Sequence, residues 1–210
     1  MFKVQSPNQK PLNFQTFQLL MNIINVGYHS TNYYALEIKN GKLLFDCGWP
    51  GTMPQFMAEL KRKGLTPSEI KYILVSHFHP DHTGLVQEFK NLGAKFILME
   101  SQVDFIAPLN KLNRTKNTLF AEILEDNNFI LKFEETRKFL ASLGLAGEII
   151  ATPGHSDDSV TLILDEGFAF TGDLPPRFVI SNEDYITNES WNKIYKHKIT
   201  RIFPAHGNQY

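Results

Sequence analysis

Residues 76–84 read SHFHPDHTG, and four possible metal ligands, His77, His79, Asp81 and His82, fall within this short stretch. The stretch follows an apolar segment typical of a strand and precedes a segment typical of a helix. Residues i and i+2 of an extended segment point to the same side, so His77 and His79 could hold one ion together. Asp81 and His82 follow around the turn and could serve a second ion. Such a cluster has no packing purpose and would be costly to bury without metal.

Short apolar segments bounded by Gly, Asn, Asp and Pro recur along the chain and predict strands. They lie at 17–24, 33–38, 43–46, 72–76, 95–99, 159–164, 168–172 and 200–203. Asn40-Gly41 is typical of a two-residue hairpin turn, so the strands on either side of it should be antiparallel. Asp165-Glu166-Gly167 predicts a second hairpin.

Helices are predicted between these strands, at 54–63, 83–92 and 188–198, and Thr66 with Glu69 has the spacing of a capping box. The segment at about 101–147 has helical patterning and is interpreted as a helical insertion. No repeat or linker interrupts the chain. The pattern predicts a single α/β domain over residues 1–210, with helices covering the outer faces of its sheets.

Length, charge and cysteine content narrow the class of protein. The 210 residues suit one domain of about 150–250 residues. The net charge of −1 gives no support for nucleic acid or an anionic membrane as a partner. One cysteine, Cys47, rules out an internal disulfide, and the N-terminal sequence lacks the pattern of a secretory signal. We therefore expect a cytoplasmic protein without a membrane span, and its oligomeric state stays open.

Further histidines and aspartates follow other predicted strands. They are Asp46, His155, Asp173 and His206. Strand ends that meet at one edge of a sheet would bring these residues to the first cluster. Nitrogen and oxygen ligands suit zinc, and also iron or manganese, whereas a single thiol excludes a sulfur-rich site. The number of candidate ligands exceeds what one zinc ion uses, which favours two ions that share a carboxylate.

The motifs HxHxDH, GH, TGD and AHG occur in this order between Asp46 and His206, and together they resemble the metallo-β-lactamase fold superfamily. The resemblance covers nearly the whole chain. It implies a four-layer αββα sandwich in which two mixed sheets are flanked by helices.

The resemblance also implies two metal sites joined by Asp173 as a bridging carboxylate. The ligands of the first metal would be His77, His79 and His155. Those of the second metal would be Asp81, His82 and His206. Asp46 matches a position that in this family supports the ligands more often than it binds metal.

The chemistry implied by the resemblance is metal-assisted hydrolysis. A water held between two divalent ions, most simply two Zn²⁺, would lose a proton near neutral pH and attack a carbonyl that one ion polarises. Asp81 is the candidate catalytic residue, because a free carboxylate oxygen there could pass the proton to the leaving group.

Three activities within the superfamily stay open, each with a small-molecule substrate. The first is a dinuclear hydrolase of a thioester or ester, similar to short hydroxyacylglutathione hydrolases (glyoxalase II-like). The second is a β-lactamase or lactonase, and the third is a mononuclear iron persulfide dioxygenase. The chain stops soon after His206, so we expect no C-terminal glutathione-binding domain. The short interval from Asp173 to His206 leaves no room for the extra domain of the nuclease branch.

One departure from the family pattern follows His155. The family often reads HTPGS here, whereas this chain reads HSDDS at residues 155–159. Asp157 and Asp158 would disfavour strongly anionic substrates, unless they face solvent or cap the next element.

Overall fold

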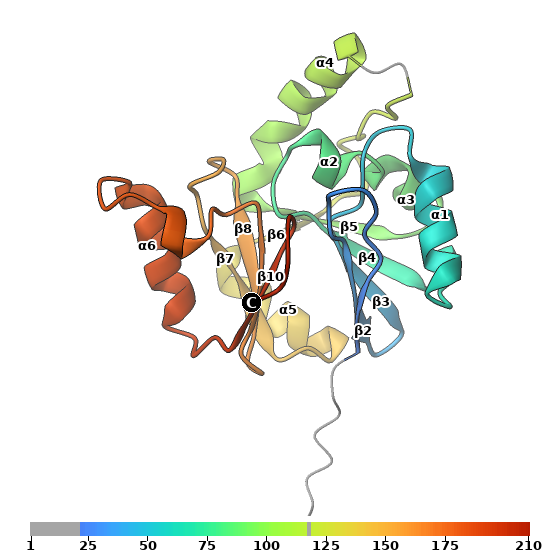
Figure 1. Cartoon of the computed structure of the whole chain (residues 1–210). Helices are drawn as coiled ribbons and strands as arrows, with labels where there is room; N and C mark the ends of the chain where they lie inside the picture. Colours follow the sequence, from blue (N-terminus) through green and yellow to red (C-terminus); the bar gives the residue numbers. More distant parts are fainter. Residues whose placement is uncertain (1–21, 117–118) are drawn as a thin grey trace, which may run out of the picture.

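The computed structural model describes residues 22–116 and 119–210, so most of the strand predicted at 17–24 lies outside the described residues. Two β-sheets pack face to face, and helices cover their outer faces (Figure 1). This arrangement confirms the predicted four-layer α/β sandwich with two mixed sheets.

The first sheet has six strands in sequence order. They are β1 (Ile23–Asn25), β2 (Tyr34–Ile38), β3 (Gly41–Phe45), β4 (Ile70–Leu74), β5 (Lys95–Met99) and β6 (Phe129–Leu131). Strands β1 to β3 are antiparallel, and β3 to β6 are parallel. The hairpin predicted at Asn40-Gly41 is confirmed, and Gly41 there has a positive φ of 129°.

The second sheet has the order β10-β9-β8-β7. Its strands are β7 (Gly147–Ala151), β8 (Val160–Leu164), β9 (Phe168–Gly172) and β10 (Arg201–Pro204). The pairs β7–β8 and β8–β9 are antiparallel, which confirms the second predicted hairpin, while β9 and β10 are parallel.

Six α-helices connect or cover these strands in the described part of the chain. They are α1 (Met53–Arg62), α2 (Pro80–Thr83), α3 (Val86–Asn91), α4 (Ile106–Lys116), α5 (Thr136–Leu143) and α6 (Tyr185–Tyr195). Short 3₁₀ turns lie at Pro67–Glu69, Glu100–Phe105, Phe133–Glu135 and Arg177–Val179. None of the helices in these residues is long and apolar enough to cross a membrane.

The single helix predicted at 83–92 is instead two helices, α2 and α3. The junction at Gly84 packs tightly on the loop at 48–50, because the Gly84 N–H donates to the Gly48 carbonyl at 2.8 Å. A Cβ atom at Gly84 would lie 2.2 Å from the Pro50 nitrogen. This close approach breaks the helix at the point where it leaves the histidine cluster.

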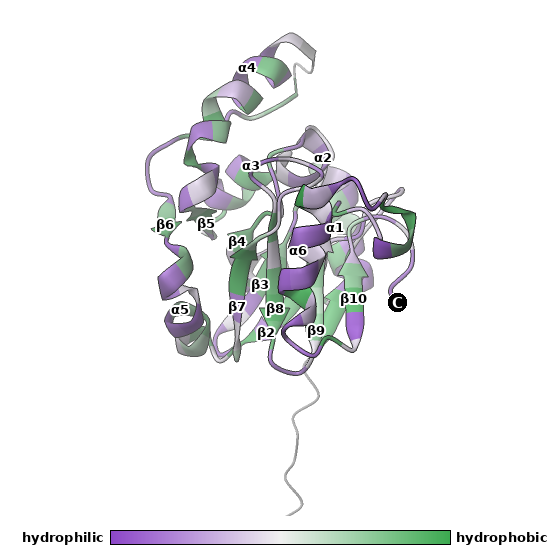
Figure 2. Ribbon diagram, turned by 90° about the vertical axis from the view of Figure 1, so that its left-hand side faces the viewer, coloured by the Kyte–Doolittle hydropathy of each residue, from purple (hydrophilic) through white to green (hydrophobic). Residues whose placement is uncertain are grey.

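Three apolar layers hold the four structural layers together. One lies between the first sheet and helices α1 and α3, and includes Phe56 and Phe89. A second lies between the two sheets, and a third packs Trp191 of α6 against the second sheet. Figure 2 shows the strands as mainly hydrophobic, and α6 as a helix with hydrophilic residues on its outward side.

The segment at 101–147 is only partly the helical insertion that the sequence predicts. It contains α4 and α5, but it also supplies β6, which pairs in parallel with β5 and forms one edge of the first sheet. The pattern is hard to recognise because β6 has three residues and follows the polar stretch EDNN at 125–128.

Candidate metal centre

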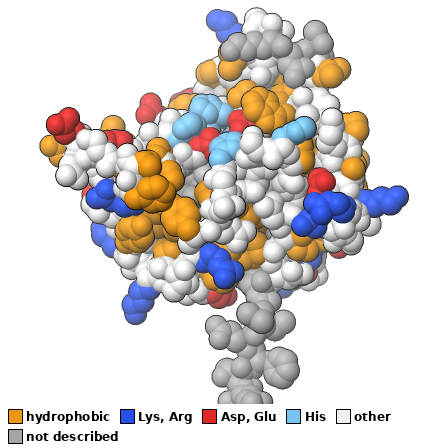
Figure 3. All heavy atoms as spheres, viewed as in Figure 1, with side chains coloured by type: hydrophobic (Ala, Val, Ile, Leu, Met, Phe, Trp, Pro, Cys, Tyr) orange, Lys and Arg blue, Asp and Glu red, His pale blue; other side chains and the backbone are white. Residues whose placement is uncertain are grey.

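The predicted ligands all lie in segments that come soon after strands, at one edge of the two sheets. His77 and His79 follow β4, Asp81 and His82 lie in α2, and the others follow β7, β9 and β10, in that order His155, Asp173 and His206. Figure 3 shows histidine and acidic side chains gathered on the upper face of the molecule.

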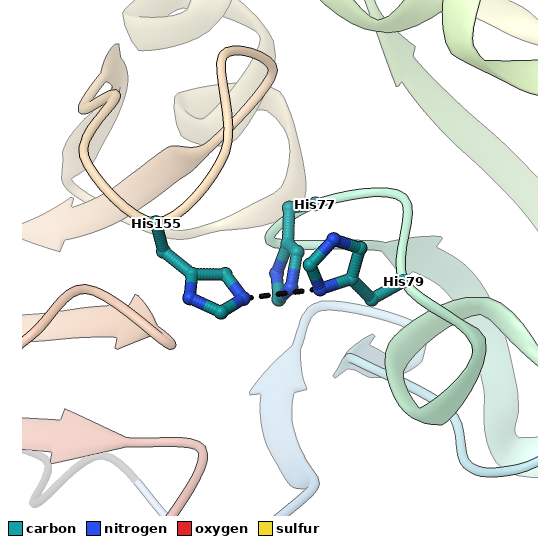
Figure 4. Close-up of side chains that lie close together, drawn as sticks. All are labelled: His77, His79 and His155. Atoms are coloured by element: carbon teal, nitrogen blue, oxygen red, sulfur yellow. Dashed lines mark hydrogen bonds between the residues drawn. The ribbon is translucent and has the colours of Figure 1, made fainter.

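His77, His79 and His155 form the first ligand group. One ring nitrogen from each lies within 4.8 Å of the others. His155 Nε2 and His79 Nδ1 are 3.0 Å apart, and the three rings face a common point (Figure 4). Three imidazole nitrogens so arranged match the ligand set of one zinc-like ion.

Asp81, His82, Asp173 and His206 form the second group, again with ligand atoms within 4.8 Å of one another. Asp81 Oδ2 lies 3.3 Å from His82 Nε2 and 3.3 Å from His206 Nε2. The structure thus places the predicted ligands of each metal together.

Asp173 stands between the two groups and turns one carboxylate oxygen toward each. Its Oδ2 lies 3.4 Å from His155 Nε2 and 3.9 Å from His77 Nε2. Its Oδ1 lies 3.4 Å from His82 Nε2 and 3.3 Å from His206 Nε2. This is the geometry that a carboxylate shared by two cations requires.

Unsatisfied buried atoms at the centre fit a divalent metal. His77 Nε2, His82 Nε2 and Asp173 Oδ1 are buried and have no hydrogen-bond partner in the described part of the chain. Buried polar atoms without partners are rare in folded proteins, because each one loses its hydration without compensation. A cation in the first group would satisfy His77 Nε2, and a cation in the second group would satisfy His82 Nε2 and Asp173 Oδ1.

Asp46 fixes the orientation of the ligands from behind. Its Oδ2 accepts a hydrogen bond from His82 Nδ1 at 2.8 Å, and its Oδ1 accepts the Ser76 N–H at 2.7 Å. The Ser76 hydroxyl donates to Asp46 Oδ2 and lies 2.9 Å from His77 Nδ1. When Nδ1 donates to these partners, Nε2 of each histidine carries a lone pair toward the centre.

Ser76 and Ser30 also support the ligands, and neither role was predicted. Ser76 could have been recognised as a small polar residue between a strand and the first ligand. Ser30 gives no such signal, since it acts through its backbone carbonyl, which accepts the His206 Nδ1–H at 2.8 Å. Only the folded chain brings residues so distant in sequence together.

The charges around the centre favour ionised carboxylates. Burial opposes ionisation of Asp81 and Asp173, but the adjacent imidazole of His82 outweighs it and lowers the pKa of both. Burial also opposes a charge on His82, yet the charge of Asp46 raises the pKa of this imidazole. Burial lowers the pKa of His77 well below its usual value.

Asp157 and Asp158 do not both place an unpaired negative charge beside the centre. Asp157 is exposed, whereas Asp158 is buried and accepts hydrogen bonds from the Phe78 N–H at 2.7 Å and the Ser156 hydroxyl at 2.8 Å. Burial raises the pKa of Asp158. These two residues were expected to disfavour anionic substrates unless they faced solvent or capped an element. That exception applies here, because Asp157 faces solvent and Asp158 links the His155 loop to the His77–His79 segment.

A hollow of about 210 Å³ opens at the centre. It is lined by His155, Gly172, Asp173, Leu174, Pro176 and His206. Leu174 and Pro176 contribute apolar side chains to this lining. None of the described residues that line the hollow is a lysine or an arginine. The hollow therefore offers space for a small group beside the ligands, with no basic side chain in its described lining to pair with an anionic one.

The fold and the two ligand groups together are those of a metal-dependent hydrolase built on an α/β sandwich. The family model of the metallo-beta-lactamase superfamily matches residues 26–206, and the chain belongs to this superfamily.

Relatives and solved structures agree with this assignment. A probable metallo-hydrolase from Methanocaldococcus jannaschii is 29% identical over 90% of this chain and 93% of its own length. A beta-lactamase-like protein 2 homolog from Caenorhabditis elegans is 32% identical over 84% of this chain, which spans 56% of that relative. A metallo-beta-lactamase family protein from Thermus thermophilus shares the fold, with a TM-score of 0.64 and 22% identity over 90% of this chain and 73% of that one.

Proposed function

We propose that this protein is a hydrolase with two zinc ions that cleaves a small thioester or ester. Two divalent ions would supply an acidified water and polarise the substrate carbonyl. The observation that carries the proposal is Asp173, whose two oxygens face different ligand groups at 3.3 to 3.9 Å. A single-metal centre would need only one of these groups.

The side chains around the centre have separate tasks in this proposal. Asp46 and Ser76 hold the imidazoles of His82 and His77 in the orientation that leaves Nε2 free. Asp81 lies beside both His82 and His206, where its carboxylate can hold a proton and return it to the leaving group. Leu174 and Pro176 form an apolar wall for an uncharged acyl group.

The size and lining of the hollow favour small esters and thioesters without a strong negative charge. Cleavage of a lactam or lactone is the second candidate, since relatives near 30% identity carry beta-lactamase-like names. A panel of thioesters, simple esters, a lactone and a β-lactam, assayed with the zinc-loaded protein, separates these substrates.

The two-metal proposal is tested by metal content. We expect about two zinc ions per chain, and we expect Asp173→Ala to lose metal and at least about a hundredfold in activity, because both sites share this carboxylate. His197→Ala is the matched control. His197 faces Glu148 at 3.8 Å, outside both ligand groups, so its removal should change activity less than about twofold.

Two outcomes would contradict the proposed function. Equal losses in the two variants would contradict the assignment of Asp173. Activity with one tightly bound iron, with oxygen consumed in the presence of glutathione persulfide, would replace the hydrolase by the dioxygenase.

A further inference from the structure

A second hollow, of about 400 Å³, lies at the edge of the first sheet opposite the metal ligands. It forms where the β2–β3 turn, the first residues of β4 and β5, and the end of α5 meet. Its floor is apolar and its rim is basic. The residues of the floor are Ile38, Tyr72 and Leu143. Those of the rim are Lys39, Lys71 and Lys95.

The position of this hollow separates it from the metal centre. Strands β4 and β5 are parallel, and the ligands His77 and His79 follow the carboxyl end of β4. Lys71 and Lys95 instead lie at the amino ends of these strands. Figure 1 shows the same separation, with α2 at the top of the molecule and α5 at the bottom. The hollow is therefore not an extension of the centre.

The floor of the hollow is suited to a flat apolar group. Ile38 and Leu143 are buried, and the half-buried Tyr72 packs edge-on against Phe139 with ring centres 5.8 Å apart. Tyr72 and Lys95 are register partners on adjacent strands, so the lysine stem lies beside the ring. The volume falls within the range of about 300–1,000 Å³ that is usual for small-molecule sites.

The rim concentrates positive charge that the described chain does not neutralise. Lys39 Nζ is within 3.3 Å of the Ser142 carbonyl near the end of α5. Lys71 and Lys95 form no ion pair with any residue in 22–116 or 119–210, and no described residue that lines the hollow is acidic. In a chain of net charge −1, this local excess favours an anion.

We propose that this hollow binds a small aromatic phosphate, with its ring on Tyr72 and the apolar floor and its phosphate between Lys71 and Lys95. Lysine binds phosphate as a point charge, and a lining that combines these lysines with an aromatic ring provides both parts of the recognition. The site is independent of the hydrolase proposed above, because it shares no residue with the metal centre.

Adenosine 5′-monophosphate is the probe, with adenosine and inorganic phosphate as its separate halves. Binding is followed by ¹H–¹⁵N NMR on the full zinc-loaded chain. We expect saturable shifts of the Tyr72 and Leu143 amides, and affinity at least about tenfold weaker for either half of the probe.

Charge reversal at the rim, Lys71→Glu with Lys95→Glu, should weaken binding by at least about tenfold. The matched control is Lys61→Glu with Lys63→Glu at the exposed end of α1, which changes the net charge equally and should alter affinity less than about twofold. The pair Lys71→Gln and Lys95→Gln repeats the test with a smaller perturbation if the reversed pair does not fold.

Three results would overturn the proposal. The first is equal weakening in the two reversed pairs, which would indicate a general charge effect. The second is a set of shifts confined to residues 76–79, which would place the probe at the metal centre. The third is absence of saturation by about 10 mM probe, which corresponds to a binding free energy too small for a specific site.

Discussion

Asp46 is the residue on which the orientation of the ligands depends most. It is fully buried, has a positive φ of 62°, and accepts hydrogen bonds from both His82 and Ser76. The positive φ marks a sharp turn directly after β3, and there the carboxylate lies beside His82 and Ser76. Aspartate and asparagine tolerate this backbone conformation better than most residues.

The variant Asp46→Asn therefore isolates the carboxylate from the backbone. Asparagine accepts the same φ, but its NH₂ group must face either His82 Nδ1–H or the Ser76 N–H, each of which is a donor. We expect the affinity for zinc to fall by about 10- to 100-fold, as is usual when a partner behind a metal ligand is lost. Competition with a chromogenic chelator measures this change. The control is Asp157→Asn, an exposed aspartate near the centre, and equal affinities in the two variants would contradict the role of Asp46.

Elements with strong local signals were predicted correctly from the sequence. The hairpin turns, strands β2 to β5 and β8 to β10, and helix α1 carry short apolar runs, an Asn-Gly pair or a proline start, and these signals are local. Strands β6 and β7 and the break between α2 and α3 were missed. All three depend on contacts with other segments: β6 pairs with β5, β7 pairs with β8, and the break exists because Gly84 meets the backbone at 48–50.

The residues of the candidate site divide in the same way, into those with a local sequence signal and those that depend on contacts between distant segments. All seven proposed ligands could be taken from motif order, and the structure brings them into two groups. The support from Ser30 and the link from Asp158 to Phe78 could not be predicted, because they join loops that are far apart in sequence.

Helix α6 allows a prediction of pH dependence. Asp184 caps this helix by accepting the Thr187 N–H at 3.0 Å, and hydrogen bonding to Thr187 lowers the pKa of Asp184. A carboxyl group whose pKa is lower in the folded state stabilises the fold above its unfolded pKa of about 3.9. The contribution is lost as the pH falls through the folded pKa.

We therefore expect Asp184→Ala to lower the midpoint of thermal unfolding at pH 7, and to lower it much less at pH 3. Asp184→Ser keeps a capping oxygen without the charge, so its effect should be smaller at pH 7 and nearly independent of pH. Calorimetry of the three proteins at both pH values measures these differences. A constant difference between Asp184→Ala and the parent across this range would show that the charge of the cap has no role.

At the scale of the whole molecule, the metal centre joins the two sheets. Four of its ligands follow strand β4 of the first sheet, and three follow strands of the second. A bound ion would therefore cross-link the two halves, and a ligand that binds the folded state alone stabilises it by about 2.7 kcal/mol at a hundred times its Kd.

Removal of zinc with a chelator should accordingly lower the midpoint of thermal unfolding, and added zinc should restore it. Hydrogen exchange should increase at the loops on both sheets, around residues 77–82 and 155–159, because the cross-link is lost. The amides of α5, at the opposite edge of the sheets from the centre, serve as internal controls. Faster exchange in one sheet alone would contradict a centre that ties the halves together.

The way β10 is held has a consequence for the order of folding. The Asn32 N–H donates to the Ala205 carbonyl and the Tyr34 hydroxyl donates to the Pro204 carbonyl, so the loop before β2 clasps the end of the last strand beside His206. These contacts span most of the described chain and are among the last that a growing polypeptide can make. The second ligand group is thus complete only after the two ends of the described domain have met, and metal uptake there would serve as a marker of finished folding.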